Sequence, residues 1–212
     1  MADERDSDFW ANRDSFRPLT PHHHLAVRLL DQAADSILSD DYRTAERLII
    51  EADIADLGTY ECSITGAINP EIHRFRPVEG TPSKASRLKK RMPPVSVELS
   101  IFERDRWRCR FCGVPVVAKK AIRLMNQRFP EAVRWRNSSK HDMHAGLRAL
   151  CSSLDHLLPH SRGGTNEPDN LVSACGPCQF GRNQWTLEEV GFTDPRGRPP
   201  VVDRWDGLMR LV

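Results

Sequence analysis

Two pairs of cysteines, each with the spacing Cys-X-X-Cys, constrain this chain more than any other feature of its sequence. The pairs are Cys109 with Cys112 and Cys175 with Cys178, and 62 residues lie between them. One such turn presents two thiolates to a single ion, so the two pairs together supply the four sulfur ligands of a tetrahedral zinc site. The segment between the pairs must therefore leave the site and return to it. The alternatives are redox-active thiols or cysteines that are buried separately.

The expected cellular setting favours metal ligation over disulfide formation. The first 16 residues are acidic and charged where a secretory signal is basic and then apolar, so we expect a cytoplasmic protein. Its six cysteines are then expected as thiols or metal ligands. No apolar run is long enough to cross a bilayer, so no membrane partner is expected.

Charge is balanced over the whole chain and divided unevenly along it. The formal net charge is +2, but residues 1–57 contain 6 Lys and Arg against 13 Asp and Glu, whereas residues 84–148 contain 17 against 5. A basic segment of this strength attracts polyanions such as nucleic acids, although a run of charge can also be a solvated surface.

The apolar periodicity predicts an α+β protein that begins with helices. Residues 25–38 and 42–58 carry apolar side chains at helical spacing and meet at a short turn, which predicts an antiparallel helical hairpin. A partner protein, a second copy or the rest of the chain would have to cover its apolar face. The predicted organisation is an acidic helical region at 1–68, a Pro-rich basic linker at 69–94 and a domain at 95–212, with an insertion at about 117–153 and a C-terminal tail at 192–212.

The C-terminal domain is expected to combine helices with two short strands. Helical patterns cover residues 95–106, 118–129 and 182–190. Residues 131–145 are polar and basic, which predicts an excursion outside the core. Apolar runs at residues 154–158 and 170–174 predict two strands around a glycine turn at 161–164.

An adjacent acid and base carry the chemistry of this domain. Asp155 and His156 come at the end of the first predicted strand, so a hard oxygen ligand lies beside an imidazole. Metal-assisted hydrolysis of a phosphodiester requires this combination, because the ion stabilises developing charge while a neutral imidazole takes a proton from water.

The order of these features resembles the HNH endonucleases of the ββα-metal, or His-Me finger, type. The first Cys-X-X-Cys pair is followed by the run DHxxPxSxGGxxxxxNL, which starts at Asp155, and then by the second pair and a basic segment. The resemblance covers about residues 96–191, with the insertion outside it. It implies a ββα-metal nuclease domain in which a structural zinc, distinct from the catalytic ion, is bound by the four cysteines.

The resemblance also implies a role for individual residues. His156 corresponds to the general base that activates water, and Asp155 to a ligand of the catalytic divalent ion, Mg²⁺ or Mn²⁺. Asn170 corresponds to the asparagine whose amide pins the loop and orients the histidine backbone. Arg182 stands where the family often has a lysine near the scissile phosphate.

Gln179 departs from the family pattern. It occupies the position at which these enzymes usually have His or Asn as the second metal ligand. A glutamine carbonyl can bind Mg²⁺, but its extra methylene displaces the oxygen. Reduced activity, an altered metal preference or another ligand such as Asn183 would each follow from this change.

The sequence therefore predicts a metal-dependent hydrolase that cleaves DNA, with RNA left open as a substrate. The expected nucleic-acid contacts are Lys119, Lys120, Arg123, His160 and Arg162. The resemblance is to bacterial enzymes of phage defence, restriction or mobile elements. One alternative is a zinc-stabilised nucleic-acid-binding module with a weak or inactive site. Another is a nuclease subunit gated by a protein partner, or by self-association, through the N-terminal helices.

Overall fold

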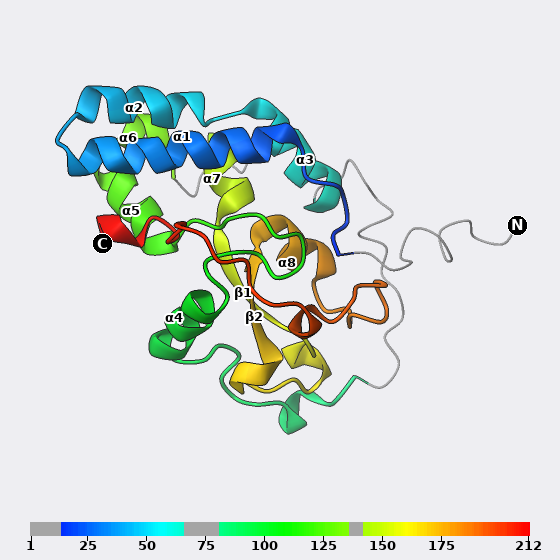
Figure 1. The fold of residues 1–212 in the computed structure, drawn as a ribbon. Helices are drawn as coiled ribbons and strands as arrows, with labels where there is room; N and C mark the ends of the chain where they lie inside the picture. Colours follow the sequence, from blue (N-terminus) through cyan, green and yellow to red (C-terminus); the bar gives the residue numbers. More distant parts are fainter. Residues whose placement is uncertain (1–13, 66–80, 136–141) are drawn as a thin grey trace, which may run out of the picture.

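The computed structural model describes residues 14–65, 81–135 and 142–212, and it combines helices with one small sheet (Figure 1). The main elements in chain order are α1 (Pro21–Leu38), α2 (Tyr42–Glu51), α3 (Ala55–Thr65), α4 (Val95–Arg104), α5 (Lys119–Arg128), α6 (Pro130–Val133), α7 (Ala145–Leu150), β1 (Ser152–His156), β2 (Leu171–Cys175) and α8 (Gly176–Arg182). This mixture confirms the predicted α+β class. No helix among the described residues has both the length and the apolar character needed to cross a membrane.

The sheet consists of β1 and β2, which pair antiparallel. Ser152 lies opposite Cys175 and His156 opposite Leu171, and all ten residues of the two strands are buried. α8 follows β2 without a connecting loop and packs on both strands. The two predicted strands are confirmed, with β1 beginning two residues earlier and β2 one residue later than the apolar runs indicated.

Two helix predictions were wrong in their limits. The helix expected to run from residue 42 to 58 is divided into α2, which ends at Glu51, and α3, which begins at Ala55. Between them the Asp53 carboxylate accepts a hydrogen bond from the Ala145 backbone at 2.6 Å. The helix expected at 182–190 does not form: α8 ends at Arg182, where it was expected to begin, and turns and loop follow to residue 190. Pro177 is in the first turn of α8, where a proline needs no hydrogen-bond partner, and Asn183 ends the helix with a φ of +50°.

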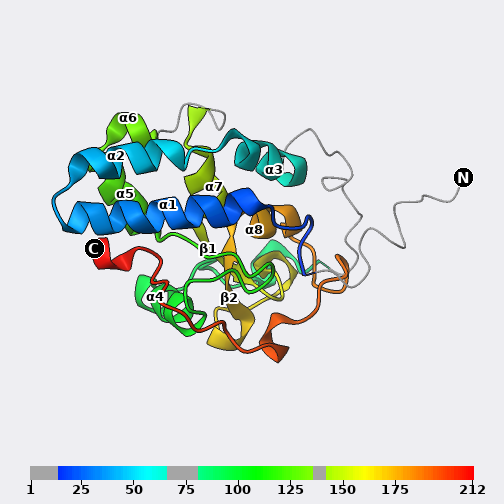
Figure 2. The ribbon, with the colours of Figure 1, turned by 45° about the horizontal axis from the view of Figure 1, so that its top comes forward.

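The N-terminal helices find their packing partner within the chain. Figures 1 and 2 show α1 and α2 side by side against the α5–α7 region, and α3 contacts both α7 and α8. Their buried apolar side chains form one cluster with those of the C-terminal part. A side chain larger than hydrogen at Gly181 of α8 would collide with Phe16 and Ile64, so this contact is close.

The described residues of the predicted insertion contribute to the core, which corrects the expectation of an excursion. α5, α6 and α7 each bury apolar residues, among them Ile122, Met125, Val133 and Leu147. A polar seam joins this segment to the N-terminal helices: Arg148 donates to Glu61 at 2.5–2.6 Å, and the ring of His144 bonds the Ile49 carbonyl at 2.8 Å. Helices α6 and α7 of the insertion therefore pack against α1–α3.

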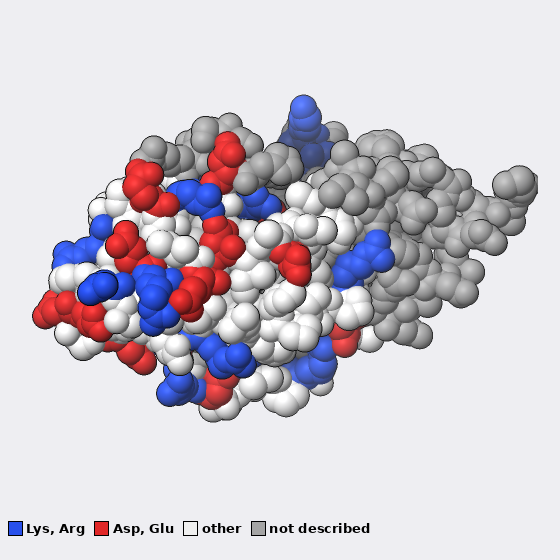
Figure 3. All heavy atoms as spheres, turned by 90° about the horizontal axis from the view of Figure 1, so that it is seen from above, with Lys and Arg blue, Asp and Glu red and all other residues white. Residues whose placement is uncertain are grey.

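Opposite charges in distant parts of the sequence pair with one another. Asp31 of α1 accepts from Arg204 and Arg210 of the C-terminal tail, and Asp53 pairs with Arg134. Acidic and basic side chains are intermixed on the described part of the face seen in Figure 3. Some acidic residues of the N-terminal part thus form ion pairs with basic residues farther along the chain.

We predict that Glu61→Gln lowers the free energy of unfolding by roughly 3 kcal/mol, because it leaves the buried Arg148 guanidinium without its counter-charge. Urea unfolding measures this change. Glu46→Gln, at an exposed position of α2, is the matched control and should change stability by less than about 0.5 kcal/mol. Equal stability of the two variants would contradict the role given to this ion pair.

Candidate active site and metal centre

The four cysteines of the two Cys-X-X-Cys pairs come together. Their sulfur atoms all lie within 4.8 Å of one another, and the sulfurs of Cys112 and Cys175 are 3.8 Å apart. Four sulfurs at about 2.3 Å from one tetrahedral ion lie about 3.8 Å from each other, so the cluster fits zinc. Cys109, Cys175 and Cys178 are buried, which favours a structural site over an exchangeable one.

The cysteine cluster joins two segments that are far apart in the sequence. Cys109 and Cys112 belong to a turn closed by a hydrogen bond from the Cys109 backbone to the Val114 carbonyl, and the Arg110 backbone donates to Ser173 of β2. Cys175 ends β2 and Cys178 lies in α8. A zinc ion here could therefore fix the first turn against the strand and the helix.

Asp155 is buried on β1 and held by a guanidinium. Arg182 lies 2.7 Å from its Oδ1 and donates through Nε to Oδ2 at 3.0 Å, while the His156 backbone donates to Oδ1 at 2.9 Å. Burial raises the pKa of this carboxyl, and the charge of Arg182 opposes the rise. A carboxylate has about four lone-pair positions, so Asp155 can still bind an ion from the pocket that it lines.

Arg182 does not lie where its sequence position implied. Its side chain is fully buried and also bonds the backbone carbonyls of His156, Leu157 and Trp185. The residue is outside the lining of the pocket, so it cannot face a phosphate there in this arrangement. Its guanidinium instead holds Asp155 and the end of β1 in place.

His156 lines the same pocket beside Asp155. Burial lowers the pKa of its imidazole below the ordinary value, while a hydrogen bond to Asn166 and the charge of Asp155 partly oppose the shift. The neutral form therefore predominates near pH 7, and this is the form that accepts a proton.

The loop after β1 is closed by Asn170. Its amide oxygen accepts from the Leu158 backbone at 2.8 Å, and its nitrogen donates to the carbonyls of Leu158 and Thr165 at 3.1 and 2.8 Å. Gly164 fits beneath this amide, since a Cβ there would come within 1.7 Å of the Leu158 oxygen and 2.9 Å of the Asn170 nitrogen. The side chain of Asn170 thus spans the loop that follows His156.

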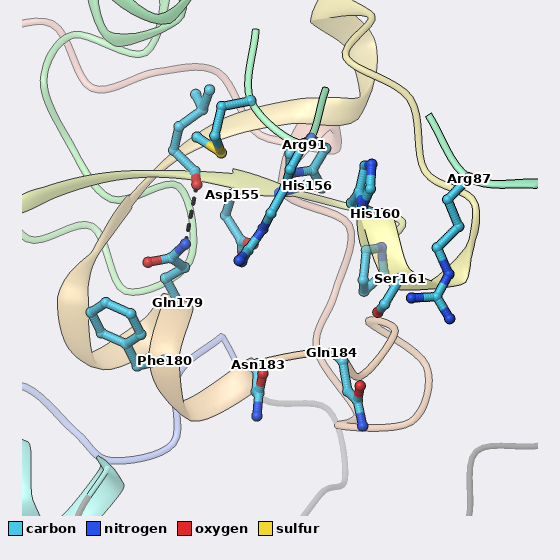
Figure 4. A pocket seen from close by; sticks show the side chains of 13 residues that line it. Arg87, Arg91, Asp155, His156, His160, Ser161, Gln179, Phe180, Asn183 and Gln184 are labelled. Atoms are coloured by element: carbon cyan, nitrogen blue, oxygen red, sulfur yellow. Dashed lines mark hydrogen bonds between the residues drawn. The ribbon is translucent and has the colours of Figure 1, made fainter. Parts of the chain in front are cut away.

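Gln179 does not direct its oxygen toward Asp155 and His156. Its amide oxygen accepts from the Ser153 hydroxyl, and its nitrogen donates to the Leu154 carbonyl at 3.3 Å (Figure 4). As a second oxygen ligand beside Asp155 it does not fit in this placement. Asn183, at the end of α8, and Gln184 line the pocket as well and carry the other side-chain amides there.

Two arginines of the linker also line the pocket, and the sequence analysis did not assign them to the site. The pocket encloses about 310 Å³ and is bounded by Arg87 and Arg91 as well as by residues of β1 and α8. In Figure 4 the two arginines lie with the histidines on one side, opposite the residues of α8. The only sequence signal for them was the basic run at 84–91, which was assigned to a connecting segment.

The five expected nucleic-acid contacts fall into two groups. Lys119, Lys120 and Arg123 are exposed on α5, which packs against α6 and the C-terminal turn and does not line the pocket. His160 lines the pocket, and Arg162 pairs with Glu189. The structure thus brings His160 to the Asp155–His156 pair and leaves the three residues of α5 elsewhere.

We predict that Cys175→Ser removes zinc from the purified chain and destabilises it, since three thiolates leave the tetrahedral site incomplete. Elemental analysis should find about one zinc per wild-type chain and far less in the variant. Cys151→Ser, which alters a cysteine outside the cluster, should retain the metal. A Cys175→Ser protein with full zinc content would disprove the assignment.

We predict that Gly164→Ala lowers the free energy of unfolding by about 1–3 kcal/mol, because the new methyl group forces the Leu158 backbone and Asn170 apart. The control is Gly197→Ala, where the added atom meets nothing within 4 Å. Urea unfolding of both variants decides the matter, and a Gly164→Ala protein as stable as the control would contradict the close approach.

Comparison with known protein families agrees with this geometry. The HNH endonuclease family matches residues 139–179, a range that includes Asp155, His156, Asn170 and the second cysteine pair. Neither a search of curated proteins nor a search of solved structures found a match to this chain. Residues 139–179 thus match the HNH endonuclease family, and the four-cysteine cluster that includes Cys175 and Cys178 is compatible with zinc.

Proposed function

We propose that this chain is a metal-dependent endonuclease that hydrolyses phosphodiester bonds of DNA. The observation that carries the proposal is the placement of Asp155 and His156 side by side in one pocket, within the segment that matches the HNH family. The succession of β1, β2 and α8 supports the finer assignment to the ββα-metal type. Roles in phage defence, restriction or a mobile element, and a cytoplasmic location, belong to this proposal through the resemblance alone.

In the proposed reaction, His156 takes the proton from the attacking water. Its neutral form is favoured by burial, and it lies in a pocket that water can enter. Asp155 would hold the divalent ion, and Arg182 opposes the rise in the pKa of this carboxyl that burial causes and fixes the direction of the carboxylate. The ion, when bound, supplies charge stabilisation at the phosphate and the leaving oxygen.

A polyanionic substrate suits the charge of the pocket. Arg87 and Arg91 line the pocket, and Lys89 and Lys90 are exposed in the same segment. Such a cluster favours contact with a phosphate backbone independently of base sequence. These residues support a nucleic-acid substrate and leave the choice between DNA and RNA to experiment.

A second candidate function follows from the placement of Gln179. Because its oxygen is bonded to Ser153, Asp155 lacks this oxygen as a neighbouring ligand. A nucleic-acid-binding module with weak activity, or a nuclease activated when a partner rearranges α8, would show this arrangement. Binding without cleavage would then be observed for the isolated chain.

We predict that the wild-type chain nicks or linearises supercoiled plasmid in Mg²⁺ or Mn²⁺ and that His156→Ala lowers the rate about 10²–10⁴-fold, the usual contribution of a general base. The reaction is followed on agarose gels, with EDTA as the metal-free arm and a structured RNA as the alternative substrate. His24→Ala, which removes an exposed histidine of α1, should cleave like the wild type.

The plasmid experiment also separates the candidates. Retardation of the plasmid without cleavage in any divalent ion would contradict the proposed enzyme and favour the binding module. Cleavage of RNA alone would correct the substrate. Equal rates for His156→Ala and the wild type would remove His156 from the mechanism.

A further inference from the structure

The loop that follows His156 is held by a segment that lies outside the HNH match. The Asn166 side-chain nitrogen donates to the Lys90 carbonyl at 3.0 Å, and His160 Nε2 lies 2.9 Å from the Leu88 carbonyl. These contacts join residues 76 and 72 positions apart in the sequence. Two backbone carbonyls of the linker therefore hold the loop beside the pocket.

The contact to Lys90 fixes the orientation of the Asn166 amide. A backbone carbonyl can only accept a hydrogen bond, so the amide nitrogen must face it. The amide oxygen must then face the other way, toward His156 Nε2, from which it is 2.8 Å away. The assignment of oxygen and nitrogen in this side chain thus follows from the linker.

The orientation of Asn166 in turn selects one tautomer of His156. An amide oxygen has no proton to give, so the proton of the hydrogen bond must come from Nε2. In a neutral imidazole with its proton on Nε2, the lone pair is on Nδ1. Nδ1 is then the atom of His156 that can accept a proton.

We propose that Asn166 is the positioning residue of His156: anchored by the Lys90 carbonyl, it holds the imidazole in the Nε2–H tautomer with Nδ1 as the proton acceptor. The catalytic part of this inference rests on the proposed nuclease function. The tautomer itself is a property of the folded chain and is tested without any reaction. The linker that reaches the pocket through Arg91 thus also sets the state of the base.

Long-range ¹H–¹⁵N correlation spectra of the full chain, recorded with the imidazoles neutral, report which ring nitrogen carries the proton. The signals of His156 are assigned by their loss in His156→Ala. We expect a single Nε2–H tautomer in the wild type and a mixture in Asn166→Ala. Asn166→Asp keeps an oxygen acceptor for Nε2 and should keep the Nε2–H tautomer, which separates the hydrogen bond from simple packing.

The kinetic arm uses plasmid cleavage under saturating and limiting substrate. Asn166→Ala should lower kcat about 10–100-fold with KM unchanged, since an outer hydrogen-bond partner orients the base without touching substrate. Asn126→Ala is the control, because it removes an amide on α5 that bonds the Trp135 backbone and lies outside the pocket. It should leave both the spectra and kcat unchanged.

A proton on Nδ1 of His156 in the wild type would overturn the inference, and so would an Asn166→Ala protein with a single Nε2–H tautomer and wild-type kcat. If no variant and no wild-type protein cleaves any substrate, the nuclease proposal fails while the spectra still decide the positioning role. An Nε2–H tautomer that is lost in Asn166→Ala and kept in Asn166→Asp would then support that role alone.

Discussion

The buried guanidinium of Arg182 organises the candidate site, because it fixes both Asp155 and the end of β1. Arg182 is fully enclosed, and its donors reach the Asp155 carboxylate and the carbonyls of His156, Leu157 and Trp185. A planar cation with five donors is suited to this position, since a lysine could satisfy fewer acceptors at once. The same interaction neutralises a buried acid and ends a β-strand. The cost of burying two charges is thereby offset by a nearly complete set of hydrogen bonds.

Short-range patterns in the sequence were sufficient to locate the site. The spacing of the cysteines predicted that four thiols meet, and the apolar runs on either side of the glycine turn placed Asp155 and His156 in the first predicted strand. Asn170 was identified only through the resemblance to the HNH family, and its partners Leu158 and Thr165 lie within the same loop. Features that depend on neighbours in sequence, or on a fixed ligand geometry, can be read without the fold.

Interactions over long sequence distances could not be predicted. A basic residue at a helix end looks the same in a sequence whether it faces solvent or an acid, so nothing in the sequence showed that Arg182 pairs with Asp155. The insertion was expected to be solvated because residues 131–145 are polar, yet Val133 and His144 are buried where α2 covers them. Likewise, the hydrogen bond from Asn166 to the Lys90 carbonyl could not be predicted, because every residue has a backbone carbonyl and the sequence does not show which one is contacted.

The docking of the linker on the loop after β1 means that the candidate site extends beyond the segment that matches the HNH family. A graft of residues 139–179 onto another scaffold would transfer Asp155, His156 and Asn166. It would leave behind the carbonyls of Leu88 and Lys90 and the first cysteine pair, all of which lie outside this range. On the proposal above, the transplanted histidine would keep its place in the sequence and lose the contact that selects its tautomer. If the chain is the proposed nuclease, a change in the length of the linker would alter the position of these carbonyls and so the state of His156. Every residue of the segment that matches the HNH family would stay the same.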